Sequence, residues 1–551
     1  MNEHSLIPEK IIKHTVILIF FFSACILNGQ TIPYRYFYRV YFNDKNINVN
    51  LTDPSFLLSE RAILRRQKSG IQAPDLRDLP VFTGYLNQVK SFGLSLHCTS
   101  KWLNTGLFKA AEPINTNTLL TLPFVKDVKT VKSPAGKSIF TDKLDFKSVE
   151  SDFPPYDQPM TMIRGHSLHN AGFDGKGILV AVLDGGFNDA EIIPSLEPLR
   201  KRKGIKATRD FVTGNDNVYD YHNHGTAVLS VLAGLIEGII RGTAPGADFM
   251  LFRTEDTSDE FPVEEDFWVA AAEYADSAGA DIITSSLGYG YFDDPLLDYK
   301  FADMDGNSTF ITKAADIAAS KGMLVFSSAG NERNKQWKRI LAPSDGDSVM
   351  CIGAVDGYGT ISAFSSAGPS ADGRIKPDNS AMGVSVTIQT SPATVTKASG
   401  TSFSCPVMSG MTACLLQAVP AATNTEIIDA IHQSADRYNS PDSLYGYGIP
   451  DMTIALKKLQ DTRLKFPESE FIISPNPTAG DIEIIFREQP ASIRLEIYSS
   501  SGRMIYRKDF DSFAGRSLIL TALNRREQGI YFVRLTTGNG VYLQKIIKIN
   551  R

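Results

Sequence analysis

The hydrophobic pattern in the middle of the chain predicts a sheet of buried strands. Residues 177–183 form an apolar run that ends in Asp184 and two glycines. Runs of this kind are typical of parallel strands that are buried on both faces, and functional groups gather at the carboxyl ends of such strands. A similar run at 349–355 predicts a second buried strand. We therefore expect Asp184 to lie at one edge of a mostly parallel sheet.

Two further apolar stretches predict helices that begin at polar residues. The first opens at His224 and continues through small apolar residues to about Gly234. The second follows Gly400-Thr401-Ser402 and continues to Leu416. A serine at a helix N-terminus lies near unpaired backbone N–H groups and the positive end of the helix dipole, which favour a developing negative charge. Ser402 is therefore a candidate nucleophile, although the same tripeptide also serves as an ordinary helix cap.

The three blocks around Asp184, His224 and Ser402 resemble the signature blocks of the subtilisin-like serine proteases (subtilases), in the chain order known for that family. Three intervening blocks are similar to family blocks too. They are Gly-Thr-Ala-Pro-Gly-Ala at 242–247, Asp-Ile-Ile-Thr-Ser-Ser-Leu-Gly at 281–288 and Phe-Ser-Ser-Ala-Gly-Asn-Glu at 326–332. The resemblance covers roughly residues 155–460. It implies an α/β fold, with a doubly wound, mostly parallel sheet and the active site at the carboxyl ends of the strands.

The resemblance also implies the chemistry, which is acyl transfer to a serine. His224 is then the base that takes the proton of Ser402, and Asp184 orients and stabilises the imidazole. Asn331 is the side-chain donor to the oxyanion, together with the backbone N–H of Ser402. Two alternatives stay open: His222 could replace His224 as the base, and Asn331 could be a plain turn residue. Cys405 is interpreted as a small apolar filler and not as a nucleophile.

By the same resemblance, two segments are expected to bind the substrate peptide. The segment 286–288 should pair with extended substrate by strand addition. The pocket for the residue before the scissile bond should lie between this segment and the segment 328–330. The expected binding residues are Ser286, Leu287, Gly288, Ser328, Ala329 and Gly330. Because these residues are small or uncharged, we expect apolar or aromatic substrate side chains in that pocket.

The N-terminal third of the chain predicts export and a separate domain. An apolar stretch at 15–27 follows a short charged segment and is too short to span a membrane comfortably, so residues 1–30 are interpreted as a signal peptide. Residues 31–135 alternate strand-like segments with a basic helix-like stretch at 54–67, and they resemble the inhibitory propeptide of secreted subtilases. The alternative is an independent binding domain. Processing is expected within 132–158, at a bond that the sequence does not identify.

Short alternating strands and turn signals fill the C-terminal region, residues 471–551, and predict a small all-β sandwich. The region resembles the sorting domain of the type IX secretion system, on the basis of Pro-Asn-Pro at 475–477, Gly-Ile-Tyr at 529–531 and the final strand that contains Lys545. This resemblance implies a Gram-negative cell, export through its periplasm and either release or attachment at the outer surface. An accessory domain that binds substrate or carbohydrate is the alternative.

Charge and cysteine content limit the possible partners, disulfides and cofactors. The net charge of −5 and the lack of a basic patch argue against nucleic acid as a partner. Cys405 and Cys414 stand nine residues apart on one predicted helix, about 13 Å along its axis, so they cannot form a disulfide with each other. No essential disulfide and no membrane span after signal removal are expected. The chemistry requires no cofactor; a structural calcium ion is compatible with the resemblance, but the loops 215–220 and 303–307 do not fit an EF-hand, so no metal ligand is predicted.

The sequence therefore predicts a secreted serine endopeptidase with three parts: a small α+β propeptide domain, a subtilisin-like catalytic domain at 155–460 and a small all-β sorting domain. The competing hypothesis is an inactive surface or adhesion protein that retains the protease fold. Hydrolysis of a different acyl bond is a third possibility. Substrate identity, processing sites, final attachment and oligomeric state are not predicted.

Overall fold

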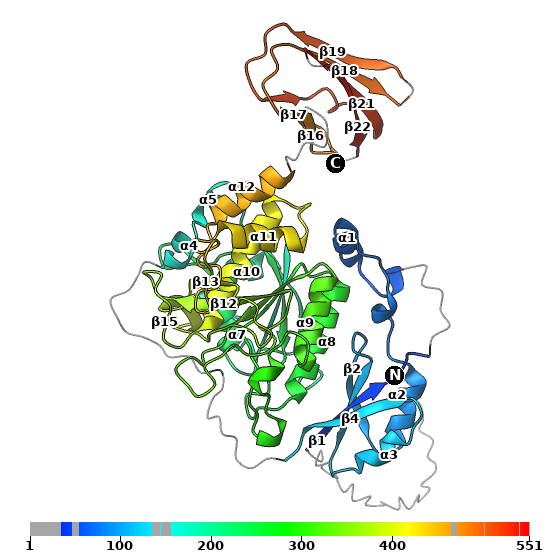
Figure 1. Cartoon of the computed structure of the whole chain (residues 1–551), viewed down its shortest axis with the longest axis vertical. Helices are drawn as coiled ribbons and strands as arrows, with labels where there is room; N and C mark the ends of the chain where they lie inside the picture. The colour runs from blue at the N-terminus through cyan, green and yellow to red at the C-terminus, as the bar shows by residue number, and fades with distance from the viewer. Residues whose placement is uncertain are drawn as a thin grey trace, which may run out of the picture.

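A computed structural model describes residues 35–46, 54–134, 144, 156–463, 471–500, 502–538 and 540–549. These residues form an N-terminal domain, a central α/β domain and a C-terminal β domain (Figure 1). The predicted signal peptide, residues 1–30, lies outside the described residues, as does most of the predicted processing region. Among the described helices, none combines the length and the apolar character needed to cross a membrane.

A seven-stranded parallel sheet forms the centre of the middle domain, in the order β13-β12-β11-β10-β5-β9-β6. Along β5, alternate residues face opposite sides: Val180 and Val182 belong to one core cluster, whereas Ala181 and Leu183 belong to the other. This two-sided burial is the reason that the strand is apolar throughout. The strands are β5 (Leu179–Asp184), β6 (Ile205–Asp210), β9 (Asp248–Arg253), β10 (Ile282–Ser285), β11 (Leu324–Ser328), β12 (Val349–Val355) and β13 (Asn379–Met382).

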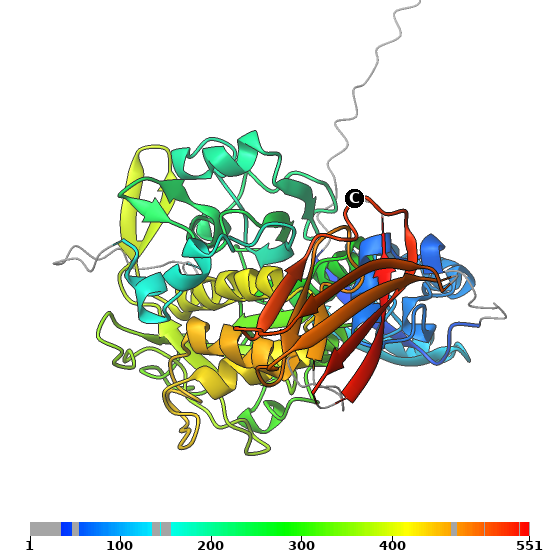
Figure 2. The ribbon, with the colours of Figure 1, turned by 90° about the horizontal axis from the view of Figure 1, so that it is seen from above.

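Helices cover both faces of this sheet (Figures 1 and 2). One core cluster joins the sheet to α7 and α10, with α11 and α12 packed outside α10, and the other joins it to α8 and α9. These helices are α7 (His224–Ala233), α8 (Val263–Ala278), α9 (Phe310–Ser320), α10 (Thr401–Ala418), α11 (Asn424–Ser434) and α12 (Met452–Arg463). Shorter elements are α4 (Gln158–Met162), α5 (His166–Asn170), α6 (Glu197–Lys201), the hairpin β7 (Leu235–Ile236) and β8 (Ile240–Arg241), and the hairpin β14 (Val386–Ser391) and β15 (Thr394–Ala398).

The strand order reverses at β5, since β6 and β9, which follow it in the chain, lie on one side of it and β10 lies on the other. Such a switch point opens a crevice at the carboxyl ends of the strands, where ligands bind in open α/β sheets. Asp184 ends β5 and Ser285 ends β10, so both lie at this crevice. The predicted fold class of the catalytic domain is confirmed.

The N-terminal domain has a four-stranded antiparallel sheet in the order β2-β3-β1-β4, with a core that includes residues of α2 and α3. Its elements are β1 (Tyr36–Phe42), α2 (Thr83–Lys90), β2 (Ser95–Ser100), β3 (Thr105–Ala110), α3 (Thr116–Leu120) and β4 (Val125–Lys132). Helix α1 (Glu60–Lys68) lies apart from this core, on an arm between β1 and α2 (Figure 1).

The N-terminal domain contacts α8 of the central domain through buried charges. Arg39 of β1 donates to both carboxylate oxygens of Asp266, with its Nη2 2.6 Å from Oδ2, and it stacks 3.5 Å from the centre of the Phe310 ring. Farther along α8, Glu273 accepts hydrogen bonds from Ser100 Oγ and from the backbone N–H groups of residues 101 and 102. The N-terminal sheet is therefore fixed to the start and the middle of α8.

The arm that carries α1 makes a second set of contacts at the other end of α8. Arg66 is fully buried and bridges Asp78 of its own domain, 2.6 Å away, and Asp276 of α8, 2.7 Å away. The neighbouring Arg65 also donates to Asp276 and to the carbonyl of Ala280. The N-terminal domain thus holds α8 at two places that are far apart along the helix.

Two antiparallel sheets, β16-β17-β20 and β19-β18-β21-β22, enclose the core of the C-terminal domain. This arrangement confirms the predicted all-β class. The strands are β16 (Phe471–Ser474), β17 (Ile482–Phe486), β18 (Ile493–Ser499), β19 (Met504–Phe510), β20 (Ser517–Leu520), β21 (Gly529–Thr537) and β22 (Gly540–Lys548).

Candidate active site

Asp184 and His224 meet at the crevice, as the sequence predicts. The Nδ1 atom of His224 lies 2.8 Å from Oδ1 of Asp184, and both side chains are almost completely buried. Gly225 permits this approach, because a Cβ there would lie 2.5 Å from the carbonyl oxygen of Gly186 and 3.0 Å from the Cβ of Asp184. A carboxylate on Nδ1 fixes the ring orientation and leaves Nε2 for proton transfer.

Ser402 lies in the first turn of α10 and lines the same cleft as His224. Pro406 has no N–H group to give to the carbonyl of Ser402, four residues earlier in the helix. Ser286 Oγ donates to that carbonyl instead, at 3.0 Å, and so joins the end of β10 to the start of α10. Between the described side chains of Ser402 and His224 the structure shows no hydrogen bond, which is common before substrate binds.

Asn331 and Ser402 present two N–H donors to one small region. The Oδ1 atom of Asn331 accepts hydrogen bonds from the backbone N–H and the hydroxyl of Thr401, at 3.0 and 3.1 Å. This fixes the amide so that its Nδ2 faces away from Thr401. A Cβ placed on Gly400 would lie 3.6 Å from Asn331 Nδ2 and 3.7 Å from Ser402 N, so both donors border the same space above Gly400. Such a pair of fixed donors can stabilise an oxyanion.

The cleft that contains these groups has a volume of about 1040 Å³. Ser286, Leu287 and Gly288 line it directly beyond β10. Ser328, the last residue of β11, and Gly330 line it as well. Ala329 lies between the latter two, but its side chain packs with Ile340 and Cys351, so only its backbone can serve a bound peptide.

The wall between the segments 286–288 and 328–330 is apolar. A Cβ on Gly288, Gly290 or Gly330 would come within 3.2 Å of a side-chain atom of Leu341, so these glycines leave room for that leucine. The carboxylate of Glu332 borders this part of the cleft, but Lys335 Nζ lies 2.9 Å away and Tyr291 donates to it. The geometry is consistent with an apolar pocket before the scissile bond.

Two alternative roles from the sequence are disfavoured by the contacts. His222 Nδ1 accepts the backbone N–H of His224 at 3.1 Å, so this ring caps the start of α7. Cys405 is fully buried, and burial raises the pKa of its thiol to about 12, which disfavours a thiolate nucleophile. The four described cysteines, at positions 98, 351, 405 and 414, are free, in keeping with the expected lack of an essential disulfide.

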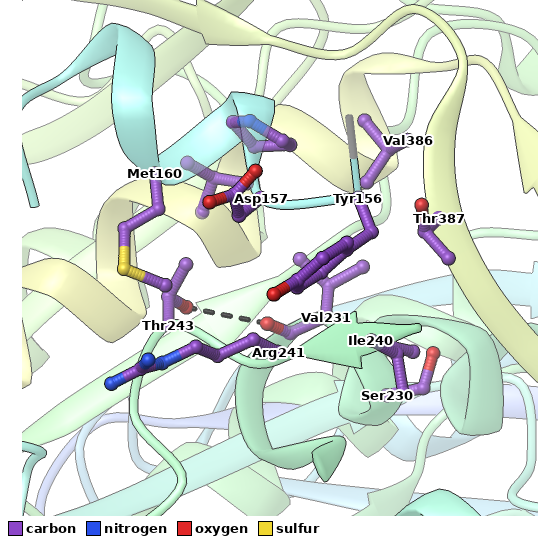
Figure 3. Close-up of a pocket in the computed structure, with 12 residues that line it drawn as sticks. Tyr156, Asp157, Met160, Ser230, Val231, Ile240, Arg241, Thr243, Val386 and Thr387 are labelled. Atoms are coloured by element: carbon purple, nitrogen blue, oxygen red, sulfur yellow. Dashed lines mark hydrogen bonds between the residues drawn. The ribbon is translucent and has the colours of Figure 1, made fainter. Parts of the chain in front are cut away.

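A second hollow lies among α4, α7, β8 and β14 (Figure 3). Its accessible volume is about 10 Å³, which is room for a single water molecule at most. The hydroxyl of Thr243 donates across it to the carbonyl of Val231. This hollow is too small for a peptide side chain.

The two loops considered for calcium do not assemble a cation site from their described carboxylates. In the first, Asp220 accepts a hydrogen bond from Asn217; in the second, Asp305 accepts the N–H groups of Asn307 and Ser308. Among the described residues, the carboxylates that converge are those of Glu255, Glu260 and Glu264, which the sequence analysis did not select. We therefore assign no calcium ligands and derive no chemistry through a metal.

Comparisons with known proteins identify similar domains and relatives. Residues 175–448 match the model of the subtilase family, residues 37–144 match the peptidase S8 propeptide domain of Bacteroidota, and residues 473–550 match the secretion system C-terminal sorting domain. Subtilisin E of Bacillus subtilis is 28% identical over 335 residues, which are 60% of this chain and 77% of that protein. A thermostable alkaline protease of Halalkalibacterium halodurans is 30% identical over 291 residues, 53% of this chain and 70% of that protein. The crystal structure of MycP1 from Mycobacterium smegmatis aligns with a TM-score of 0.43 at 21% identity, over 58% of this chain and 88% of that one.

The α/β fold and the cleft that contains Ser402 are those of a serine hydrolase. The chain belongs to the subtilase family, with an S8 propeptide domain before the catalytic domain and a type IX secretion sorting domain after it. It is a secreted serine endopeptidase.

Proposed function

We propose that this enzyme cleaves peptide bonds through an acyl-enzyme on Ser402, with His224 as the general base and Asp184 as its orienting partner. The observation that carries the proposal is the buried contact of 2.8 Å between Asp184 and His224, in the same cleft as Ser402. In the first step His224 takes the proton of the hydroxyl while Ser402 Oγ bonds to the substrate carbonyl carbon. The protonated imidazole then gives that proton to the leaving amine, and water repeats the sequence to release the acid.

In this mechanism the tetrahedral oxyanion accepts hydrogen bonds from Asn331 Nδ2 and from the backbone N–H of Ser402. We expect Asn331→Ala to lower kcat by about 100- to 1000-fold with little change in KM, because the donor acts mainly in the transition state; that magnitude comes from the equivalent asparagine of subtilisin. Steady-state kinetics on an internally quenched peptide would measure it. Asn307→Ala, at an exposed position, is the control for loss of an amide. A loss of less than fivefold in Asn331→Ala would remove Asn331 from the mechanism.

We further propose an apolar or aromatic side chain before the scissile bond, held between the segments 286–288 and 328–330. The apolar wall that Leu341 forms against Gly288 and Gly330 supports this preference. The sorting domain is proposed to direct the chain from the periplasm across the outer membrane of a Gram-negative cell, with either release or surface attachment as the end point.

The N-terminal domain is proposed to keep the enzyme inactive until it is removed. Leu144, the last residue of the propeptide match, is buried in the cleft against Gly185, next to Asp184. A peptide substrate would have to displace it.

The carboxyl of Glu273 makes this docking dependent on pH. Burial raises the pKa of Glu273 from 4.5 to about 7, more than its three hydrogen-bond donors lower it. Because the docked state binds the proton more tightly, docking is strongest below the ordinary pKa and weakens as the pH rises through about 7. The docking free energy that is lost is roughly 3 kcal/mol.

We therefore expect the melting temperature of a full-length Ser402→Ala chain to fall between pH 5 and pH 8. Adding Glu273→Gln should make this decrease in melting temperature smaller, since glutamine does not titrate. Glu237→Gln, at an exposed position, should leave it unchanged. Equal pH slopes for the Glu273 and Glu237 variants would contradict the assignment.

A further inference from the structure

Three buried carboxylates gather on the side of the cleft that faces α8. Glu255 and Glu260 line the cleft, and Glu264 lies in the first turn of α8. One carboxylate oxygen from each lies within 4.8 Å of the others, and the three residues are 2%, 6% and 0% exposed. Ionised carboxylates so close together repel one another in a buried site, and a cation placed among them stabilises the charged form.

Hydrogen bonds hold two of these carboxylates in place. Tyr289 OH donates to Glu255, and the backbone N–H of residue 256 donates to Glu264 Oε1 at 2.7 Å. The loop at Glu260 is fixed through its backbone, since its N–H donates to Asp293 Oδ2 at 3.1 Å. The cluster is therefore a preformed part of the cleft wall.

The side chain of Leu144 also reaches this wall. Leu144 is the last residue of the propeptide match and is buried against Gly185. The Cβ of Glu255 lies at the same place, 3.6 Å from where a Cβ of Gly185 would be. A side chain that comes from outside the catalytic domain thus already lies beside the acidic cluster, and in the sequence a lysine, Lys143, immediately precedes it.

The contact between Tyr289 and Glu255 indicates where the cluster lies relative to the scissile bond. This residue directly continues the segment 286–288, along which the upstream part of a bound peptide is proposed to pair. Its hydroxyl contacts Glu255, so the cluster borders substrate residues that lie upstream of the apolar pocket.

We propose that Glu255, Glu260 and Glu264 form a subsite for the side chain of a substrate lysine or arginine, located upstream of the residue at the scissile bond. The inference rests on the proposed peptidase function and specifies its substrates: an apolar residue at the cleavage position and a basic residue before it. An ammonium or guanidinium group offers several N–H donors to the three carboxylates and enters with a peptide that the cleft already binds.

The test uses internally quenched peptides that differ at one position only. Lysine, ε-acetyl-lysine or norleucine is placed in turn at each of the four residues upstream of the cleaved bond, and kcat/KM is measured with the mature enzyme. We expect lysine to exceed norleucine by about tenfold or more at one position, which corresponds to a charged hydrogen bond of about 1.5 kcal/mol or more. Acetylation should abolish this advantage. Because it changes only the peptide, this arm does not depend on the folding of a variant.

The ratio of lysine to norleucine is then measured in Glu260→Gln and in Glu237→Gln, the matched exposed control. The ratio should fall about tenfold in the first and stay unchanged in the second. A ratio near one at all four positions in the wild type would overturn the subsite, as would a lysine advantage that Glu260→Gln retains. A melting temperature that rises with CaCl₂ in the wild type but not in Glu260→Gln, without a lysine advantage, would assign the cluster to a metal ion and also overturn it. If no peptide is cleaved, norleucine peptides included, the proposed peptidase function itself fails.

Discussion

Replacing Ser402 with alanine is expected to lower kcat by about a millionfold, the effect that removal of the nucleophile has in subtilisin. The variant should fold normally, because the residue sits in a helix turn that alanine favours and its carbonyl still accepts the hydrogen bond from Ser286. The measurement is hydrolysis of an internally quenched peptide by the purified chain, with circular dichroism as the check on folding.

Ser404→Ala is the matched control, since Ser404 lies in the same turn and its hydroxyl donates to the carbonyl of Thr401. Activity within about tenfold of the wild type is expected for this variant. If Ser402→Ala keeps more than a hundredth of the wild-type rate, Ser402 is not the nucleophile.

The second large effect is expected at Asp276, where the arm of the N-terminal domain docks on α8. Asp276→Ala leaves Arg65 without its buried partner carboxylate and removes one of two from Arg66. Breaking a buried pair in this way costs about 3–5 kcal/mol, mainly because a charge remains buried without compensation. The N-terminal domain should then dissociate from α8 far more easily.

Limited proteolysis and thermal unfolding of full-length Ser402→Ala chains, with and without Asp276→Ala, would measure this effect. The double variant should be cut faster between the domains and should melt at a lower temperature. Asp216→Ala breaks an exposed ion pair with Arg209 and should change neither result. A double variant as resistant as its parent would show that the arm contributes nothing to docking.

The positions of the candidate site residues can be predicted from the sequence because these residues stand at the ends of regular elements. The apolar run before Asp184 is β5, and the helices expected after His224 and Ser402 are α7 and α10. The sequence block around each residue is local and indicates where one strand or helix begins or ends. The sheet then brings these ends together. The segment 286–288 differs in detail, since β10 ends at Ser285 and these residues follow the strand.

Long-range charge pairing could not be predicted. The helix-like stretch at 54–67 is found as α1, shifted to Glu60–Lys68, but nothing local indicates that Arg66 pairs with a residue 210 positions away. The acidic run at 255–266 would ordinarily be interpreted as a solvated surface. Five of its acidic residues are nevertheless buried: Glu255, Glu260, Glu264, Glu265 and Asp266. Asp266 pairs with Arg39 of the N-terminal domain, a contact that exists only in the assembled fold.

In the C-terminal domain, the strand-like segments 481–486 and 493–498 predict β17 and β18 nearly residue for residue, whereas no such pattern indicates β20 (Ser517–Leu520). Its four residues are too few to show an alternating pattern. It is a strand because β17 pairs with it along Ile482–Ile485, a contact that sequence periodicity does not reveal.

The most direct test of the central claim is to label the secreted, mature enzyme with a fluorophosphonate probe and to map the labelled residue by mass spectrometry. The probe reacts with a serine hydroxyl only where a base activates it, so the account predicts one adduct, on Ser402, that is lost in Ser402→Ala and strongly reduced in His224→Ala. An adduct on another serine, or no adduct on folded enzyme from which the N-terminal domain has been removed, would contradict the proposed mechanism.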